Sequence, residues 1–78
     1  MRLADHFGAA VRRHRELLRL SQEELAERAD MDRTYVSGVE RGVRNPSLDV
    51  MQRIATALGA DLDVLFATAR EVGTHKDA

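Results

Sequence analysis

Two helix-length segments separated by a break of only two residues constrain the fold of this chain more than any other feature. The first opens with the letters SQEE at residues 21–24, a capping box in which the serine hydroxyl and the last glutamate each satisfy a backbone amide. This box predicts a helix over 22–29. Residues 30–31 form the break, and Asp32 can cap a further helix that ends at Gly42. The pattern predicts two short helices joined by a tight turn.

Helical signals also mark the rest of the chain. Near the N-terminus, one face of a helix with a period of 3.6 residues is formed by Phe7, Val11, His14 and Leu18. Residues 43–46 form a loop, since Pro46 keeps the residue before it out of the helical conformation. Ser47 caps a fourth helix, which Gly59 ends. The apolar face of that helix is Met51, Ile54, Ala55 and Leu58.

The last segment completes an all-α fold. Asp61 is expected to cap a fifth, short helix with Leu62 and Leu65 turned inward, and the polar residues after Arg70 are expected to fray. No stretch shows the alternating pattern of a strand. The sequence therefore predicts a compact five-helix bundle containing a helix-turn-helix, with one domain over residues 1–70 and a polar C-terminal tail over 71–78.

Composition argues against several other classes of protein. The chain has no cysteine, and its three histidines lack the close spacing of a zinc site, so we expect no disulfide, no metal and no cofactor. No apolar run approaches the roughly 20 residues of a membrane span, and no signal peptide opens the chain, so we expect a cytoplasmic protein without a membrane partner. Glu23, Glu24 and Glu27 resemble a solvated helix face rather than paired carboxylates in a cleft, which argues against an enzyme.

The charge of the chain is uneven, although its sum is only −1. Residues 47–78 carry three lysines and arginines against five aspartates and glutamates, so the cations lean toward the first half of the chain. This asymmetry permits an anionic partner for the first half without requiring one.

One face of the helix predicted after Asp32 has an unusual composition for a surface exposed to water. Its residues are Arg33, Thr34, Ser37 and Gly38, opposite an inward face of Val36, Val39 and Glu40. Arginine can bind guanine through two hydrogen bonds, threonine can contact a thymine methyl group, and serine can bond a base or a phosphate. Gly38 costs about 1 kcal/mol in a helix interior, and close approach to DNA or to Tyr35 would offset that cost. The strip favours binding in the major groove of DNA.

The alternative is an ordinary protein surface. In that interpretation Arg33 is a solvated cation, Tyr35 is a half-buried cap on the core, and Gly38 is a tolerated defect in the helix.

Three segments resemble the phage-repressor-like (Xre-type) helix-turn-helix family. They are LSQEELAERA, DRTYVSGVERG and RNPSLDVMQRIATALGADLDVLF, and the resemblance covers about residues 5–67. It implies a lambda-repressor-like domain that binds double-stranded DNA. The stretch DRTYVSGVERGVRNPS in so short a chain is most similar to the controller proteins of restriction–modification systems, which are dimeric transcriptional regulators. RNA polymerase is a candidate further partner.

The resemblance also implies roles for individual residues. It implies that the base edges of the DNA are contacted by Arg33, Thr34 and Ser37, and that Tyr35 lies beside the DNA backbone or a base step. It also implies that the DNA phosphates are contacted by Gln22, Arg41, Arg44 and Asn45. Arg15 and Glu40 match an ion pair that ties the first helix to the recognition helix, and this pair orients the reading residues without reading the sequence itself.

Three positions depart from the family pattern. Gly38 removes a side chain that some relatives use to contact a base, so specificity there is expected to come from neighbouring residues or from DNA shape. Asp30 stands where the turn often has glycine, and aspartate can adopt the left-handed conformation there at some cost. His14 stands where leucine is usual, and we expect a hydrogen-bonded or partly exposed histidine rather than a ligand.

Apolar residues on the fifth helix predict a homodimer. If Leu62 and Leu65 face the core, Val64 and Phe66 point partly outward, with Val50 close by, and family dimers form near this helix. The expected function is therefore a sequence-specific, dimeric transcriptional regulator on an inverted-repeat operator. A DNA-binding antitoxin of a toxin–antitoxin pair and a prophage-type repressor remain alternatives, and the neighbouring genes would distinguish them.

Overall fold

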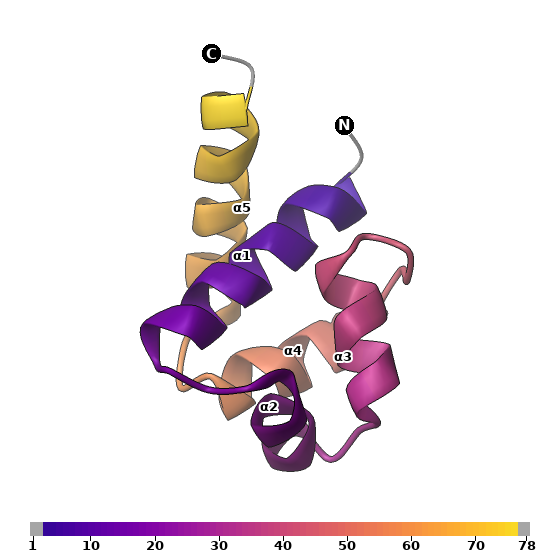
Figure 1. Cartoon of the computed structure of the whole chain (residues 1–78). Coiled ribbons are helices and arrows are strands. Elements are labelled where there is room, and N and C mark those ends of the chain that lie inside the picture. The colour runs from indigo at the N-terminus through magenta and orange to yellow at the C-terminus, as the bar shows by residue number, and fades with distance from the viewer. Residues whose placement is uncertain (1–2, 77–78) are drawn as a thin grey trace.

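The computed structural model describes residues 3–76 and, within the last helix, the side chains as far as residue 73. Over this range the chain forms only helices, which are α1 (Leu3–Leu17), α2 (Gln22–Ala29), α3 (Arg33–Glu40), α4 (Leu48–Ala57) and α5 (Leu62–Lys76) (Figure 1). The predicted all-α bundle of five helices is confirmed. None of these helices is long and apolar enough to cross a lipid bilayer.

The arrangement of the helices leaves α3 at one edge of the molecule. Figure 1 shows α1 across the middle, with α5 on one side of it and α3 on the other. α1 packs on both of these helices, and α2 packs on α3 and α4. Because α3 has neighbours only on its inner side, its outer side is open to a partner.

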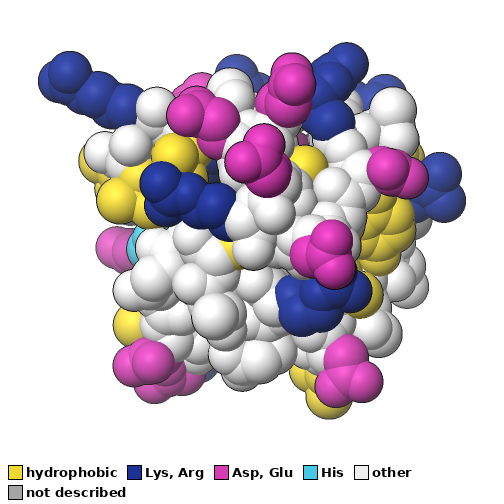
Figure 2. Space-filling view, turned by 90° about the horizontal axis from the view of Figure 1, so that it is seen from below, with side chains coloured by type: hydrophobic (Ala, Val, Ile, Leu, Met, Phe, Trp, Pro, Cys, Tyr) yellow, Lys and Arg dark blue, Asp and Glu magenta, His cyan; other side chains and the backbone are white. Residues whose placement is uncertain are grey.

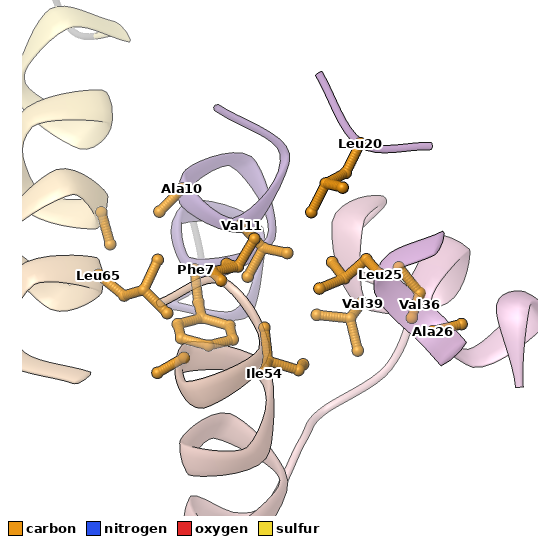
Figure 3. Close-up of a cluster of buried hydrophobic side chains, with 13 residues drawn as sticks. Phe7, Ala10, Val11, Leu20, Leu25, Ala26, Val36, Val39, Ile54 and Leu65 are labelled. Carbon is orange, nitrogen blue, oxygen red and sulfur yellow. The ribbon is translucent and has the colours of Figure 1, made fainter. Parts of the chain in front are cut away.

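The core forms where these helices meet (Figure 3). Its largest fully buried side chains are Phe7, Val11, Leu25, Val36, Val39, Ile54 and Leu65. Leu25 and Ala26 of α2 lie against Val36 and Val39 of α3 in this cluster. The small side chain at Ala26 allows the two helices to approach closely. Burying an aliphatic or aromatic side chain of this size contributes about 1.5–3 kcal/mol, so the cluster fixes the angle between α2 and α3.

The first four helices all end in the same way. The first or second residue after each of these helices has a left-handed backbone conformation. The four residues are Arg19, Asp30, Gly42 and Gly59. The amide of that residue bonds to the carbonyl three residues earlier, and the next amide bonds to the carbonyl five residues earlier. These two hydrogen bonds satisfy backbone carbonyls at the end of the helix that would otherwise lack a partner, and they reverse the direction of the chain. The left-handed conformation expected for Asp30 is confirmed, with φ of 56°.

Arg19 is the costliest of these four turns, because a long L side chain disfavours a positive φ. Its φ is 57° and its side chain is exposed. We expect Arg19→Gly to raise the free energy of unfolding by about 1 kcal/mol. Arg13→Gly, inside α1, should lower it by a similar amount. Urea denaturation of both variants measures this difference, and a loss of stability in Arg19→Gly would contradict it.

Two of the predicted serine and aspartate caps form, at Ser21 and Ser47. The Ser21 hydroxyl accepts from the Glu24 amide and the Glu24 carboxylate accepts from the Ser21 amide, so the predicted capping box is present. These hydrogen bonds hold the pKa of Glu24 below its usual value. Ser47 accepts from the Val50 amide at the start of α4. The prediction for Asp32 is wrong in part, since it precedes α3 with an extended backbone but its side chain makes no capping bond.

Two other expectations need correction. Leu18 lies beyond the end of α1 and is 49% exposed, so it does not continue the buried face of Phe7 and Val11. The fifth helix is not short, because it runs from Leu62 to Lys76 and crosses the expected boundary at residue 70. Packing along α1 explains this length: Leu65, Ala69 and Gly73 of α5 are all buried. Tertiary contacts therefore hold a segment whose own composition is polar.

Candidate nucleic-acid interface

The outer side of α3 carries the residues predicted to contact bases. Arg33 and Thr34 are exposed, and Tyr35 and Ser37 are half-buried at the edges of the same surface. Gly38 is buried, which corrects the prediction that it faces outward with this strip. The four side chains that remain offer a forked donor, two aliphatic hydroxyls and one phenol ring. We call Arg33, Thr34, Tyr35 and Ser37 the α3 strip.

A buried ion pair holds α3 against the rest of the fold. The Arg15 Nε donates to Glu40 Oε2 at 2.7 Å, and Arg15 Nη2 donates to Glu40 Oε1 at 3.0 Å. A third bond runs from Arg15 Nη1 to the carbonyl oxygen of Leu20. The hydrogen bonds to Glu40 raise the pKa of Arg15. The ion pair predicted from the family resemblance is confirmed, and it joins the end of α1 to the end of α3.

Gln22 connects this ion pair to the α3 strip. Its Nε2 donates to Glu40 Oε1 at 3.0 Å, and its Oε1 accepts from Arg33 Nη1 at 3.4 Å. The orientation of the amide follows from its partners, because a carboxylate can only accept and a guanidinium can only donate. A continuous polar chain therefore runs from Arg15 through Glu40 and Gln22 to Arg33. This connection was not predicted from the sequence.

The turn between α2 and α3 is held by a residue that sequence reasoning missed. Arg53 of α4 donates from Nε and Nη2 to the carbonyl oxygen of Ala29, at 3.2 and 2.7 Å, and also to the carbonyl oxygen of Asp30. These carbonyls belong to the end of α2, where a cation is favourable to the helix dipole. Arg53 thus fixes the turn that sets the direction of α3. No local pattern around residue 53 signals this role, because its partners are 23 and 24 residues away.

The two arginines and the asparagine that are predicted to contact phosphates after α3 all lie on the surface. Arg41, Arg44 and Asn45 are all exposed on the end of α3 and the following loop. The guanidinium carbon of Arg44 is 5.8 Å from the centre of the Tyr35 ring, a cation–π distance. The structure therefore brings one predicted phosphate contact next to one member of the α3 strip.

The remaining candidate residues are the histidine at position 14 and the predicted dimer residues on α5. The His14 Nε2 lies 2.9 Å from Thr68 Oγ1, whose hydroxyl donates to the Val64 carbonyl, so the expected hydrogen-bonded histidine is confirmed. Within the described part of the chain, no three His, Cys, Asp or Glu side chains gather to form a metal site. Among the predicted dimer residues, Val64 is 43% exposed and Phe66 is half-buried.

Phe66 and Val50 lie in different surface grooves. Phe66 packs against Phe7, with ring centres 6.0 Å apart, and lines a groove beside Leu3 and His6. Val50 lines a second groove with Tyr35 and Met31 next to the turn of the helix-turn-helix. The structure therefore does not place Val50 beside Phe66 within one such groove.

The family of the chain is shown by comparison with known proteins. The helix-turn-helix family model matches residues 11–65. An uncharacterised helix-turn-helix-type transcriptional regulator of Mycobacterium tuberculosis is 44% identical over 62 residues, which are 80% of this chain and 44% of that protein. The chain thus spans less than half the length of this relative.

Two solved controller proteins share the fold. The restriction–modification controller protein C.AhdI from Aeromonas hydrophila has 45% sequence identity and a TM-score of 0.78, covering 80% of this chain and 94% of that one. The controller C.Esp1396I, solved as a tetramer with its natural operator of 35 base pairs, has 28% identity and a TM-score of 0.84, covering 91% of this chain and 92% or more of the solved one. The chain therefore belongs to the helix-turn-helix family of DNA-binding transcriptional regulators, and it is homologous to the controller proteins of restriction–modification systems.

Proposed function

We propose that the protein binds an inverted-repeat operator in double-stranded DNA as a twofold dimer and regulates transcription from it, as a restriction–modification controller. It acts by binding and not by catalysis. The observation that carries this proposal is the α3 strip on the open side of a helix that the Arg15–Glu40 pair holds rigidly. A rigid helix that offers an arginine fork and hydroxyls matches the donors and acceptors of the major groove.

Base recognition falls to the α3 strip in this proposal. Arg33 binds a guanine, Thr34 and Ser37 contact neighbouring base edges, and Tyr35 lies beside a base step. Gln22 holds Arg33 from the side through its amide oxygen, which leaves one amide hydrogen for a phosphate. The guanidinium of Arg33 thus enters the groove partly oriented.

Phosphate binding falls to Gln22 and to the residues after α3. Arg41, Arg44 and Asn45 would contact the backbone on one side of the groove, while Gln22 contacts it on the other. The surface seen in Figure 2 carries acidic and basic side chains interspersed, without a single basic field. With a net charge of −1, attraction to DNA depends on these few arginines, so affinity should fall steeply between low and physiological salt.

Dimer formation follows from the geometry of DNA. One chain has one recognition helix, and a twofold dimer places two of them about 34–36 Å apart, one helical turn of DNA. We propose that Val64 and Phe66 contribute to this interface. The partly exposed position of Val64 and the controller tetramer seen on its operator support this assembly. RNA polymerase becomes a partner where the operator lies beside a promoter.

Val64→Asp tests the dimer with little risk to the fold. Phe66→Asp is a poorer choice, because the Phe66 ring packs on Phe7. We expect Val64→Asp to sediment as a folded monomer without DNA, because a carboxylate in an apolar interface must lose its hydration. Val43→Asp is the matched control, since Val43 is 63% exposed on the loop after α3. It should remain a dimer, and a dimer for both variants would contradict the assignment of α5.

Arg33→Ala tests the function itself. An operator is first selected from random duplexes with the wild-type chain. Arg33→Ala should then lose about 1–3 kcal/mol of binding free energy and its preference at one guanine in each half-site. Arg13→Ala, an exposed arginine of α1, should bind with nearly unchanged preference.

The ranking of single-base operator variants decides the outcome. If the wild-type chain selects no sequence, the proposed function is wrong. If it selects one and Arg33→Ala keeps the same ranking, the reading residue has been assigned wrongly. The similarity to C.AhdI favours a controller over an antitoxin or a prophage repressor, and a methyltransferase gene and a nuclease gene beside this one would test that choice.

A further inference from the structure

Gly38 occupies a position in α3 that has no conformational need for glycine. It lies within the regular helix, and the glycines with a positive φ in the described chain are Gly42 and Gly59. A Cβ atom at position 38 would lie 2.5 Å from the Cγ of Arg44 and 3.5 Å from its Cδ and Nε. The missing side chain therefore leaves space that the aliphatic part of Arg44 occupies.

The backbone brings Arg44 to this space. The carbonyl oxygen of Gly38 accepts from the amides of Val43 and Arg44, at 3.0 and 3.2 Å, so the loop folds back onto the same turn of α3. From there the Arg44 side chain reaches the ring of Tyr35, which lies one helical turn before Gly38. Two independent contacts, one of backbone and one of ring, thus fix the path of this arginine across α3.

We propose that Gly38 is a positioning residue for DNA binding, because its notch seats the stem of Arg44 and holds the guanidinium on Tyr35 beside the α3 strip. This inference rests on the DNA-binding function proposed above. An arginine that is already held in place loses less conformational freedom when it meets the DNA. A competing explanation is that Gly38 lies against the DNA directly and that any side chain there would collide with it.

A double-mutant cycle separates these two explanations. Gly38→Ala adds a methyl group that displaces the Cγ of Arg44, so the affinity for the operator should fall about three- to tenfold. In the Arg44→Ala background there is no Cγ to displace, and Gly38→Ala should then have no further effect. Thermal unfolding should show no loss of stability in Gly38→Ala, because alanine is the better helix former.

The affinities of the four chains are measured by fluorescence anisotropy with one labelled operator at one salt concentration. A loss that is the same with and without Arg44 would overturn the proposal in favour of direct contact with DNA, and no loss in either background would also overturn it. If the wild-type chain itself binds no operator, the proposed function has failed instead.

A second measurement needs no DNA. Tyr35 is the single tyrosine of the chain, so its ring protons are unambiguous in an NMR spectrum. The wild-type chain should show nuclear Overhauser effects between this ring and the Arg44 side chain, Gly38→Ala should lose them, and Ser37→Ala should keep them. Absence of these signals in the wild-type chain would show that the notch is not occupied in solution, and the proposal would be wrong.

Discussion

Arg15→Ala is expected to lower the free energy of unfolding by about 3–5 kcal/mol, a large fraction of the stability of a domain of this size. The reason is the carboxylate left behind. The Glu40 side chain is only 3% exposed, and it receives two of its hydrogen bonds from Arg15, so removal of the guanidinium leaves a buried charge with little compensation. Only the bond from Gln22 remains among the hydrogen bonds described above.

Arg12→Ala is the matched control for this variant. Arg12 pairs with Glu16 on the surface of the same helix, where the two side chains are 64% and 56% exposed. Its loss should cost less than about 1 kcal/mol, since water replaces the ion pair. Urea denaturation followed by circular dichroism compares the two variants. An equal, small cost for both would mean that the Arg15–Glu40 pair does not secure α3.

Insertion of five base pairs between the half-sites of a selected operator is expected to abolish cooperative binding of the dimer. The insertion turns one half-site by about half a helical turn, so two recognition helices related by a rigid twofold axis cannot enter both grooves. Affinity should fall to the level of one half-site, because a single helix contacts too few base pairs for tight binding. Electrophoretic mobility shifts measure this loss directly.

The same five base pairs placed outside the two half-sites provide the control. That duplex has the same length and the same half-sites, and it should bind like the original operator. Undiminished affinity for the duplex with the internal insertion would mean that the two binding heads are not held as a rigid pair. The Val64→Asp variant should be insensitive to either insertion, which links this experiment to the interface proposed on α5.

The local structure of the chain could be predicted because the relevant groups are close in sequence. The capping box at Ser21 joins atoms three residues apart, and the left-handed turn at Asp30 is closed by backbone hydrogen bonds that span five residues or fewer. Such interactions form in nearly the same way wherever the segment lies in the fold. The inward face of α3, with Val36 and Val39, followed from helical periodicity alone.

Errors arose where a local signal did not decide the observed structure. Asp32 has a side chain suited to capping, but it makes no capping bond at the start of α3. The polar composition after Arg70 suggested a frayed end, whereas α5 continues to Lys76 because its buried side lies along α1. The glycine at position 38 suggested an outward surface, whereas Arg44 covers it.

The sequence by itself therefore determined the presence of five helices, the turns that end α2, α3 and α4, and the polar composition of the α3 strip. Only the tertiary structure decided that Arg53 holds the turn, that Gln22 joins Glu40 to Arg33, and that Arg44 lies across Gly38. The physical reason is the range of the interactions. A side-chain bond between residues far apart in the chain requires atoms to meet within about 3 Å, and their distance is set by the angles at which whole helices pack.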